Sequence, residues 1–136
     1  MRVLAALAFM AQPACAWEFT ALPICTLSRD APEMRAKVTY EGQIYALRLD
    51  HPEGWPEAAV FSIRFVPNGP VISTTRHRVT GTVLEVTDSG FGNVLNGLQF
   101  NQTAIAELGD IARPIDLSEA ADPVAAFRDC DPAPLS

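Results

Sequence analysis

Arg35-Ala-Lys-Val-Thr-Tyr-Glu-Gly-Gln-Ile-Tyr-Ala-Leu-Arg-Leu-Asp50 carries the clearest structural pattern in the chain. Apolar and polar side chains alternate on both sides of Gly42-Gln43, which is the period of a β-strand buried on one face. A glycine and a polar residue between two such runs are typical of a tight turn. The sequence therefore predicts an antiparallel hairpin with strands at 35–41 and 44–50.

The same alternation continues along the chain and predicts mainly strands. The clearest strand is Ala59–Val66, because Phe61, Ile63 and Phe65 fall on one face. Further strands are predicted over residues 71–75, 78–88 and 112–117, with a turn at 67–70 and a bend or bulge at 80–81. Residues 103–108 are predicted to form either a strand or a short turn.

A middle helix is predicted between Gly90 and Phe100. Its apolar residues recur at positions 91, 94, 95 and 98, the spacing of one helix face. Asp88 or Ser89 is expected to cap its N-terminus, because short polar side chains accept hydrogen bonds from the first free backbone N–H groups.

The two ends of the chain complete the predicted fold. Ser118 is expected to cap a closing helix with Asp122 near its positive end and Cys130 in its last turn. Residues 17–32 are interrupted by prolines and are predicted to form an extended arm. The fold class predicted is α+β, mainly β: a small antiparallel β-sandwich or half-barrel with one middle helix and one C-terminal helix.

Residues 1–16 have the pattern of a secretory signal peptide. Arg2 precedes the apolar run Val3–Ala11, and an A-x-A cleavage site ends at Ala16. The apolar run is too short to span a bilayer. We therefore expect cleavage after Ala16, a single β-rich exported domain at 17–136 without a membrane span, and a periplasmic or secreted location.

The cysteines fit an oxidising compartment. Cys15 belongs to the expected signal peptide, which leaves Cys25 and Cys130 in the mature chain. A single disulfide between them is the expected arrangement. The alternative is a pair of redox-active thiols, which would need a C-x-x-C motif or a basic helix N-terminus to lower a thiol pKa, and the sequence shows neither.

The charge balance bears on the class of partner. The 136 residues contain 16 Asp and Glu against 10 Lys and Arg, for a formal net charge of −6. Nucleic acids and anionic membrane surfaces are bound through basic patches. We therefore expect no nucleic-acid partner.

The second half of the sequence resembles a known family. From residue 91 to 130 the predicted order is a short helix, a strand pair, the segment Pro114-Ile-Asp-Leu-Ser118 and an alanine-rich helix with Phe127. This order resembles that of the invasion-associated locus B family of small exported alphaproteobacterial proteins. The resemblance covers about a third of the expected mature chain.

A broader resemblance runs from Trp17-Glu18-Phe19 through Gly90-Phe-Gly-Asn-Val-Leu-Asn-Gly-Leu98. Over this length the chain is similar to uncharacterised small exported proteins of Rhodobacter-like alphaproteobacteria, some of which carry a name borrowed from the excision-repair nuclease excinuclease ABC. The resemblance implies a periplasmic protein and brings no site residue. The acidic charge does not fit a DNA-repair nuclease.

The best candidate for a binding site is the run Arg76, His77 and Arg78. Two planar guanidinium groups beside an imidazole suit a carboxylate or phosphate group of a ligand or partner, whereas the alternative is a solvated turn. His77 beside the hydroxyls of residues 73–75 suggests a hydrolase. No nucleophile-elbow sequence is present, so we expect no catalytic site.

The loop at residues 51–56 supplies two further candidates. An exposed Trp55 would stack on a ligand or an interface, and the alternative is that it plugs the end of the sandwich. His51 and His77, with Asp88 as a third ligand, would be needed for a metal site, but their spacing is not typical of one. We expect neither a metal nor a cofactor.

These observations favour an exported, non-enzymatic binding or interaction module. Its two loops would meet an envelope protein or a small anionic ligand, since binding residues concentrate on loops held by a rigid scaffold. Two alternatives stay open: a small periplasmic hydrolase that uses His77, and a structural component of the cell envelope.

Overall fold

The computed structural model describes residues 16–130. The predicted signal peptide, apart from Ala16, lies outside the described residues. Within this range the elements are β1 (Trp17–Thr20), β2 (Cys25–Asp30), β3 (Arg35–Glu41), β4 (Ile44–Asp50), β5 (Phe61–Val66), β6 (Val71–Thr74), β7 (Arg78–Thr80), β8 (Val83–Asp88), α1 (Gly92–Phe100), β9 (Thr103–Leu108), β10 (Ile111–Asp116) and α2 (Ala121–Arg128).

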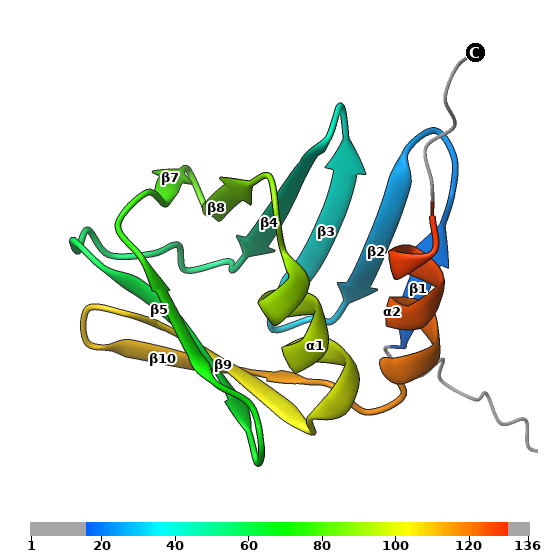
Figure 1. Ribbon diagram of the computed structural model, residues 1–136. Coiled ribbons are helices and arrows are strands. Elements are labelled where there is room, and N and C mark those ends of the chain that lie inside the picture. Colours follow the sequence, from blue (N-terminus) through cyan, green and yellow to red (C-terminus); the bar gives the residue numbers. More distant parts are fainter. Residues whose placement is uncertain (1–15, 131–136) are drawn as a thin grey trace, which may run out of the picture.

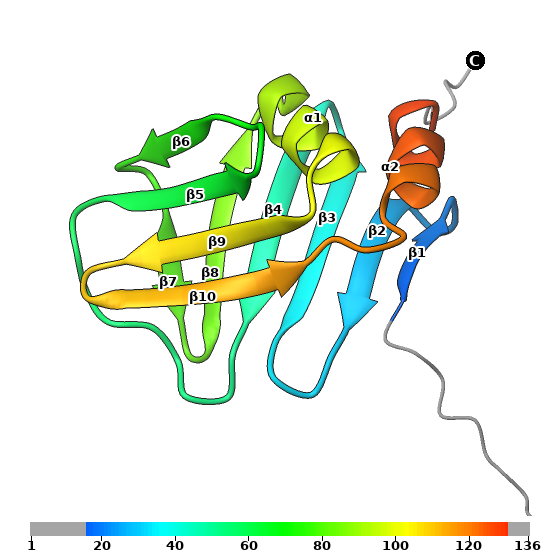
Figure 2. The ribbon, with the colours of Figure 1, turned by 90° about the horizontal axis from the view of Figure 1, so that it is seen from below.

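The strands form two antiparallel sheets that face each other. The larger sheet has the order β1-β2-β3-β4-β8-β7, and the smaller has the order β10-β9-β5-β6. Figure 1 shows α1 between the two sheets at one end, and Figure 2 shows strands of the smaller sheet crossing those of the larger at a steep angle. The predicted fold class, a mainly β sandwich with a middle and a C-terminal helix, is confirmed.

The hairpin predicted for residues 35–50 is confirmed. β3 pairs with β4 from Arg35↔Asp50 to Glu41↔Ile44. Gly42 and Gln43 both have positive φ, 61° and 65°. A two-residue turn with two left-handed residues has the twist that matches the flanking strands, which explains why the chain reverses at this glycine.

The prediction of an extended N-terminal arm is wrong. β1 and β2 form a hairpin in which Trp17 pairs with Arg29, and β2 continues into the larger sheet beside β3. Pro23 lies in the turn between the strands, so it does not interrupt either of them. Trp17 is buried, and its indole Nε1 donates a hydrogen bond to the Asp116 carbonyl at 2.9 Å.

The predicted helix caps are also wrong. α1 begins after Phe91 and α2 after Ala120, and neither N-cap residue makes a side-chain cap hydrogen bond. The Asp88 carboxylate instead accepts from the Ser89 backbone N–H at 2.6 Å, and Ser118 donates its N–H to Asp116. Packing of the apolar helix faces therefore positions both helices without capping side chains.

One cluster of buried side chains fills the space between the sheets. The largest fully buried members are Phe65, Leu27, Leu49, Leu84, Leu108, Val38 and Val124. The predicted disulfide is confirmed: Cys25 at the start of β2 is bonded to Cys130, which follows α2. It fastens α2 beside β1 and β2, the strands that α2 contacts.

In residues 16–130 no helix has the length and apolar character needed to cross a membrane.

Candidate functional site

Trp55 belongs to the interior and not to an exposed loop. Its exposed fraction is 9%, and its indole Nε1 donates to the Leu49 carbonyl at 3.1 Å. The Arg113 guanidinium lies 4.5 Å from the centre of the Trp55 ring. Of the two alternatives that the sequence left open for Trp55, the buried plug is therefore the arrangement found, and the exposed stacking residue is not.

His51 shapes the loop in which it lies. Its Nδ1 accepts a hydrogen bond from the Glu53 backbone N–H at 3.1 Å, and its ring stands edge-on to Trp55 at 6.4 Å between centroids. His51 and Trp55 thus hold the 51–56 loop against the sandwich. Within residues 16–130 no three or more His, Cys, Asp and Glu side chains are grouped so that they could hold a metal ion.

The side chains of Arg76, His77 and Arg78 do not converge on one point. His77 Nε2 lies 3.0 Å from the Ala58 carbonyl oxygen and donates to it when it carries the ring proton, and the buried Nδ1 has no partner in the described residues. No hydroxyl or carboxylate in this part of the chain is bonded to the imidazole. His77 therefore fixes the loop before β5, and the geometry required of a general base is not assembled.

Arg78 is occupied by a carboxylate. Its guanidinium donates to Glu85 at 2.9 Å, and Arg48 contacts the other oxygen of the same carboxylate at 2.8 Å. The hydrogen bond from Arg78 is the main cause that lowers the pKa of Glu85, burial opposes it, and the charge of Arg48 adds to the lowering. Arg78 is thereby tied to the larger sheet.

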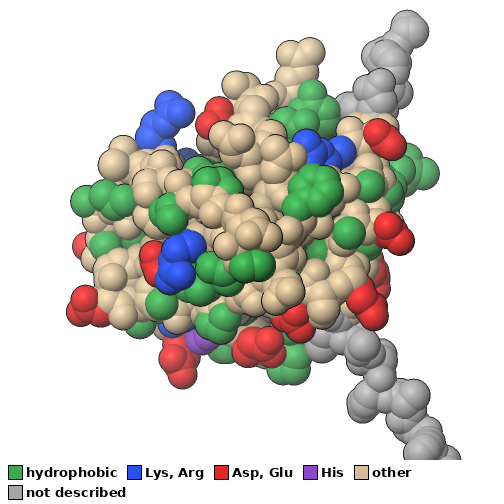
Figure 3. All heavy atoms as spheres, turned by 60° about the horizontal axis from the view of Figure 1, so that its bottom comes forward, with side chains coloured by type: hydrophobic (Ala, Val, Ile, Leu, Met, Phe, Trp, Pro, Cys, Tyr) green, Lys and Arg blue, Asp and Glu red, His purple; other side chains and the backbone are tan. Residues whose placement is uncertain are grey.

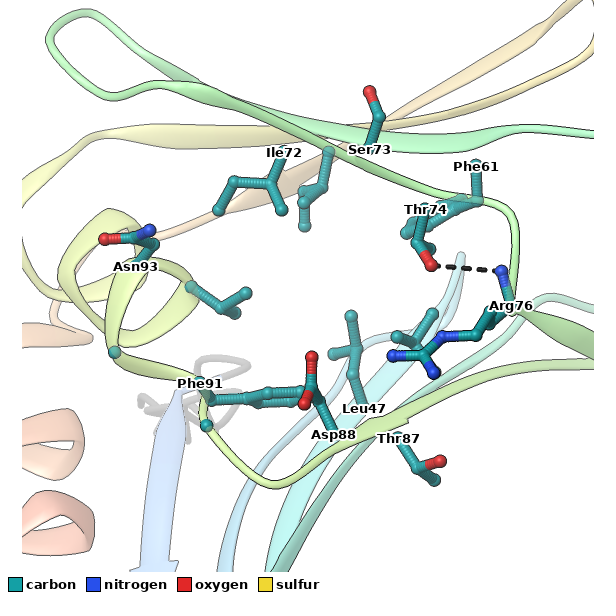
Figure 4. Close-up of a pocket in the computed structure, with 15 residues that line it drawn as sticks. Leu47, Phe61, Ile72, Ser73, Thr74, Arg76, Thr87, Asp88, Phe91 and Asn93 are labelled. Atoms are coloured by element: carbon teal, nitrogen blue, oxygen red, sulfur yellow. Dashed lines mark hydrogen bonds between the residues drawn. The ribbon is translucent and has the colours of Figure 1, made fainter.

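A cleft of about 550 Å³ opens between the two sheets beside the first turn of α1. Its apolar lining consists of Leu47, Phe61, Ile63, Ile72, Val86, Phe91 and Val94. Its polar lining consists of Ser73, Thr74, Arg76, Thr87, Asp88 and Asn93. Figure 4 shows an open centre with β6 on one side and the end of β8 on the other; Arg76 and Asp88 point toward it, whereas Ser73 and Thr87 point away from it.

The cleft exists because two sheet edges diverge. β6 is an outer strand of the smaller sheet. β7 pairs only with Val83–Glu85 of β8, so the Val86–Asp88 end of β8 has a partner, β4, on one side alone. The chain passes from β6 to β7 through residues 75–77 at one end of the gap, and α1 closes the other end.

Arg76 is one of two charged side chains that line the cleft, and it has no ion-pair partner in the described residues. Its backbone N–H donates to Thr74 Oγ1 at 3.0 Å, whereas its guanidinium points toward the middle of the cleft (Figure 4). In residues 16–130 it is the only arginine whose guanidinium makes neither a hydrogen bond nor an ion pair. The other arginines are held by Glu33, Asp50, Glu85, Glu107, the Gly54 carbonyl, Asn96 and Gln99.

Asp88 gives the cleft a second charge. Its carboxylate points into the same space from the end of β8 (Figure 4), but no ion pair joins it to Arg76. Ser89 satisfies one of its oxygens. Arg76 and Asp88 therefore lie at the polar opening of the cleft, and the apolar side chains form its base. Their charges can select between anionic and cationic ligand groups.

Of the five residues proposed from sequence, Arg76 alone lines this cleft. Most of the cleft was missed, because its walls come from β4, β5, β6, β8 and α1. No family model, curated protein or solved structure matches this chain. The function is therefore inferred from the chemistry of the cleft.

Proposed function

We propose that this protein is an exported, non-enzymatic binding module. Its ligand lies in the cleft between the sheets, places an apolar part against the base and presents a carboxylate or similar anionic group to Arg76. The observation that carries this proposal is the one unpaired guanidinium of the described residues, aimed into an apolar cleft. A volume of about 550 Å³ falls in the range of roughly 300–1,000 Å³ that small-molecule sites occupy.

The Arg76 guanidinium supports an anionic group at its side of the cleft margin, whereas the Asp88 carboxylate disfavours one at the opposite side. A guanidinium offers a planar fork of donors that matches a carboxylate, and charge-assisted hydrogen bonds of this kind are about twice as strong as neutral ones. On the face shown in Figure 3, acidic side chains gather mainly around the rim, and Lys and Arg are few. Because the net charge of the protein is negative, we expect an anionic ligand to bind at the unpaired guanidinium of Arg76 and to be repelled elsewhere on the surface.

The proposed location is the periplasm or the medium outside the cell. A disulfide is compatible with this location, since disulfides persist in oxidising compartments. The signal-peptide pattern and the resemblance to small exported alphaproteobacterial proteins support the same proposal. A small anionic ligand fits the cleft better than a flat envelope-protein surface does. The hydrolase alternative has less support, because His77 is bonded to a carbonyl.

Replacing Arg76 is the test of this proposal. We use decanoate as the probe, an apolar chain with a carboxylate, and decanol as its uncharged counterpart. Arg76→Ala is expected to weaken decanoate binding by about 10- to 100-fold, the equivalent of about 1.5–3 kcal/mol for hydrogen bonds to a charged group. Isothermal titration calorimetry measures the affinity, and decanol is expected to bind both proteins weakly and alike.

Arg78→Ala is the matched control. It removes one positive charge, as Arg76→Ala does, but from a side chain that is bonded to Glu85. It is expected to leave decanoate affinity within about twofold of wild type and to cost less than about 1 kcal/mol in stability, as exposed ion pairs do. Equal loss of affinity in both variants would mean that general charge, and not the cleft, attracts the ligand.

A further inference from the structure

β6 is an unprotected sheet edge beside the cleft. Edge strands usually carry charges, prolines or a covering element, because their free backbone groups otherwise pair with other chains. Val71–Thr74 contains neither a charge nor a proline, and the side chain of Val71 is 57% exposed. The other outer strands of the described residues are defended: β1 packs against α2, β7 is three residues long and starts with Arg78, and β10 contains Arg113 and Pro114.

The free backbone groups of β6 can be assigned from its register. The Phe65 backbone N–H donates to the Pro70 carbonyl at 3.2 Å, and the ladder continues through Ile63↔Ile72 and Phe61↔Thr74. Backbone groups alternate in direction along an antiparallel strand. The N–H and C=O groups of Val71 and Ser73 therefore point away from β5, toward the open edge.

The opposite margin of the cleft offers the same chemistry. Residues 86–88 of β8 are paired with β4 but extend past the last residue that β7 covers. Two unpaired stretches of backbone thus border one apolar cleft, and Arg76 and Asp88 stand at the same opening. A rigid apolar ligand would leave these backbone groups unused.

We propose that the ligand is an extended peptide that adds a strand to β6 and sets a carboxylate against Arg76. This inference rests on the proposed function and names its ligand class. Main-chain hydrogen bonds to Val71 and Ser73 supply affinity in this mode of binding, and alternate side chains of the peptide enter the cleft and supply specificity. The inward side chain of Ile72 forms part of the apolar wall that receives them.

A second copy of this chain fits the edge less well. Pairing of β6 with β6 would bring two molecules of net charge −6 together, and their mutual repulsion opposes this contact. A peptide with an acidic residue or a free C-terminal carboxylate complements Arg76 directly. Charge complementarity therefore favours the peptide.

The probes are two end-blocked peptides, Thr-Val-Thr-Val-Thr-Asp and Asp-Thr-Val-Thr-Val-Thr, which present a carboxylate at either end. Ser73→Pro removes an outward N–H of β6 and leaves the ladder to β5 intact. It is expected to weaken binding of the tighter of the two peptides by about tenfold or more, because one main-chain hydrogen bond is lost and the proline ring prevents close approach of the peptide strand. Ser73→Ala is the control: it loses the hydroxyl contact with Ser62 but keeps the N–H.

A backbone N-methylated form of the same peptide tests the proposal if Ser73→Pro does not fold. It keeps every side chain, and it is expected to bind wild-type protein at least about tenfold more weakly. Equal binding of the methylated and unmethylated peptides would overturn strand addition. Decanoate binding that depends on Arg76, without any peptide binding, would overturn this inference alone and leave the proposed function standing. Dimerisation that Ser73→Pro abolishes, without peptide binding, would assign the edge to a second copy and overturn the peptide.

Discussion

The Cys25→Ala/Cys130→Ala variant is expected to lose about 2–5 kcal/mol of unfolding free energy. The bond joins residues 105 positions apart, so its removal releases a long loop in the unfolded chain. It also frees α2 from β2 at the end of the sandwich where α2 covers β1. Small domains are stable by only about 5–15 kcal/mol, so the loss is a large part of the total.

Urea unfolding followed by circular dichroism measures this loss. Alanine is chosen because Cys25 is 2% exposed, and a serine there would bury a hydroxyl. Adding reductant to the variant serves as the control and is expected to change nothing, whereas it is expected to destabilise the wild type. An unchanged midpoint in the variant would show that the sheets alone hold α2 in place.

Gly97→Ala is expected to destabilise the protein by about 1–3 kcal/mol, although alanine is the better helix former. A Cβ at Gly97 would overlap Cδ2 of the Phe65 ring unless one of them shifted. The ring is 1% exposed, so the surrounding core leaves it little freedom to move. The same substitution at Gly92, where the added Cβ would point into open space, is the control and is expected to be neutral or slightly stabilising.

Thermal unfolding of both glycine variants measures the difference. Adding Phe65→Leu to Gly97→Ala tests the cause, because a smaller side chain leaves room for the methyl group. The double variant is then expected to lose less than the two single changes added together. If the double variant lost as much unfolding free energy as the two single variants together, contact with Phe65 would not be the cause of the destabilisation by Gly97→Ala.

Much of the fold could be predicted from short-range patterns. The hairpin at 35–50 combines a two-residue alternation with a glycine turn, and both signals are local. The extended N-terminal arm is a wrong prediction because prolines suggest an interrupted segment, whereas Pro23 and Pro32 lie in turns at the ends of β2. The caps failed because burial of Phe91 and Ala120 outweighs the preference for polar caps at these positions.

The site could be predicted only in part. Arg76 and Arg78 look equivalent in the sequence. Their sequence neighbours do not indicate that Glu85 pairs with Arg78 and leaves Arg76 unpaired. Trp55 looks exposed in the sequence because its partners, the Leu49 carbonyl and Arg113, meet it only in the folded chain. The cleft itself depends on how far β7 extends along β8, which is a property of the sheet.

The proposed binding of an anionic ligand between the sheets at Arg76 is tested most directly by an amide NMR titration. Wild-type protein is titrated with decanoate, and the loop at 51–56 serves as an internal reference. We expect saturable shifts at Ile72, Phe91, Val94 and Arg76, and unchanged signals from the reference loop. Shifts centred on the 51–56 loop, or no saturable shift in the cleft, would contradict the proposal.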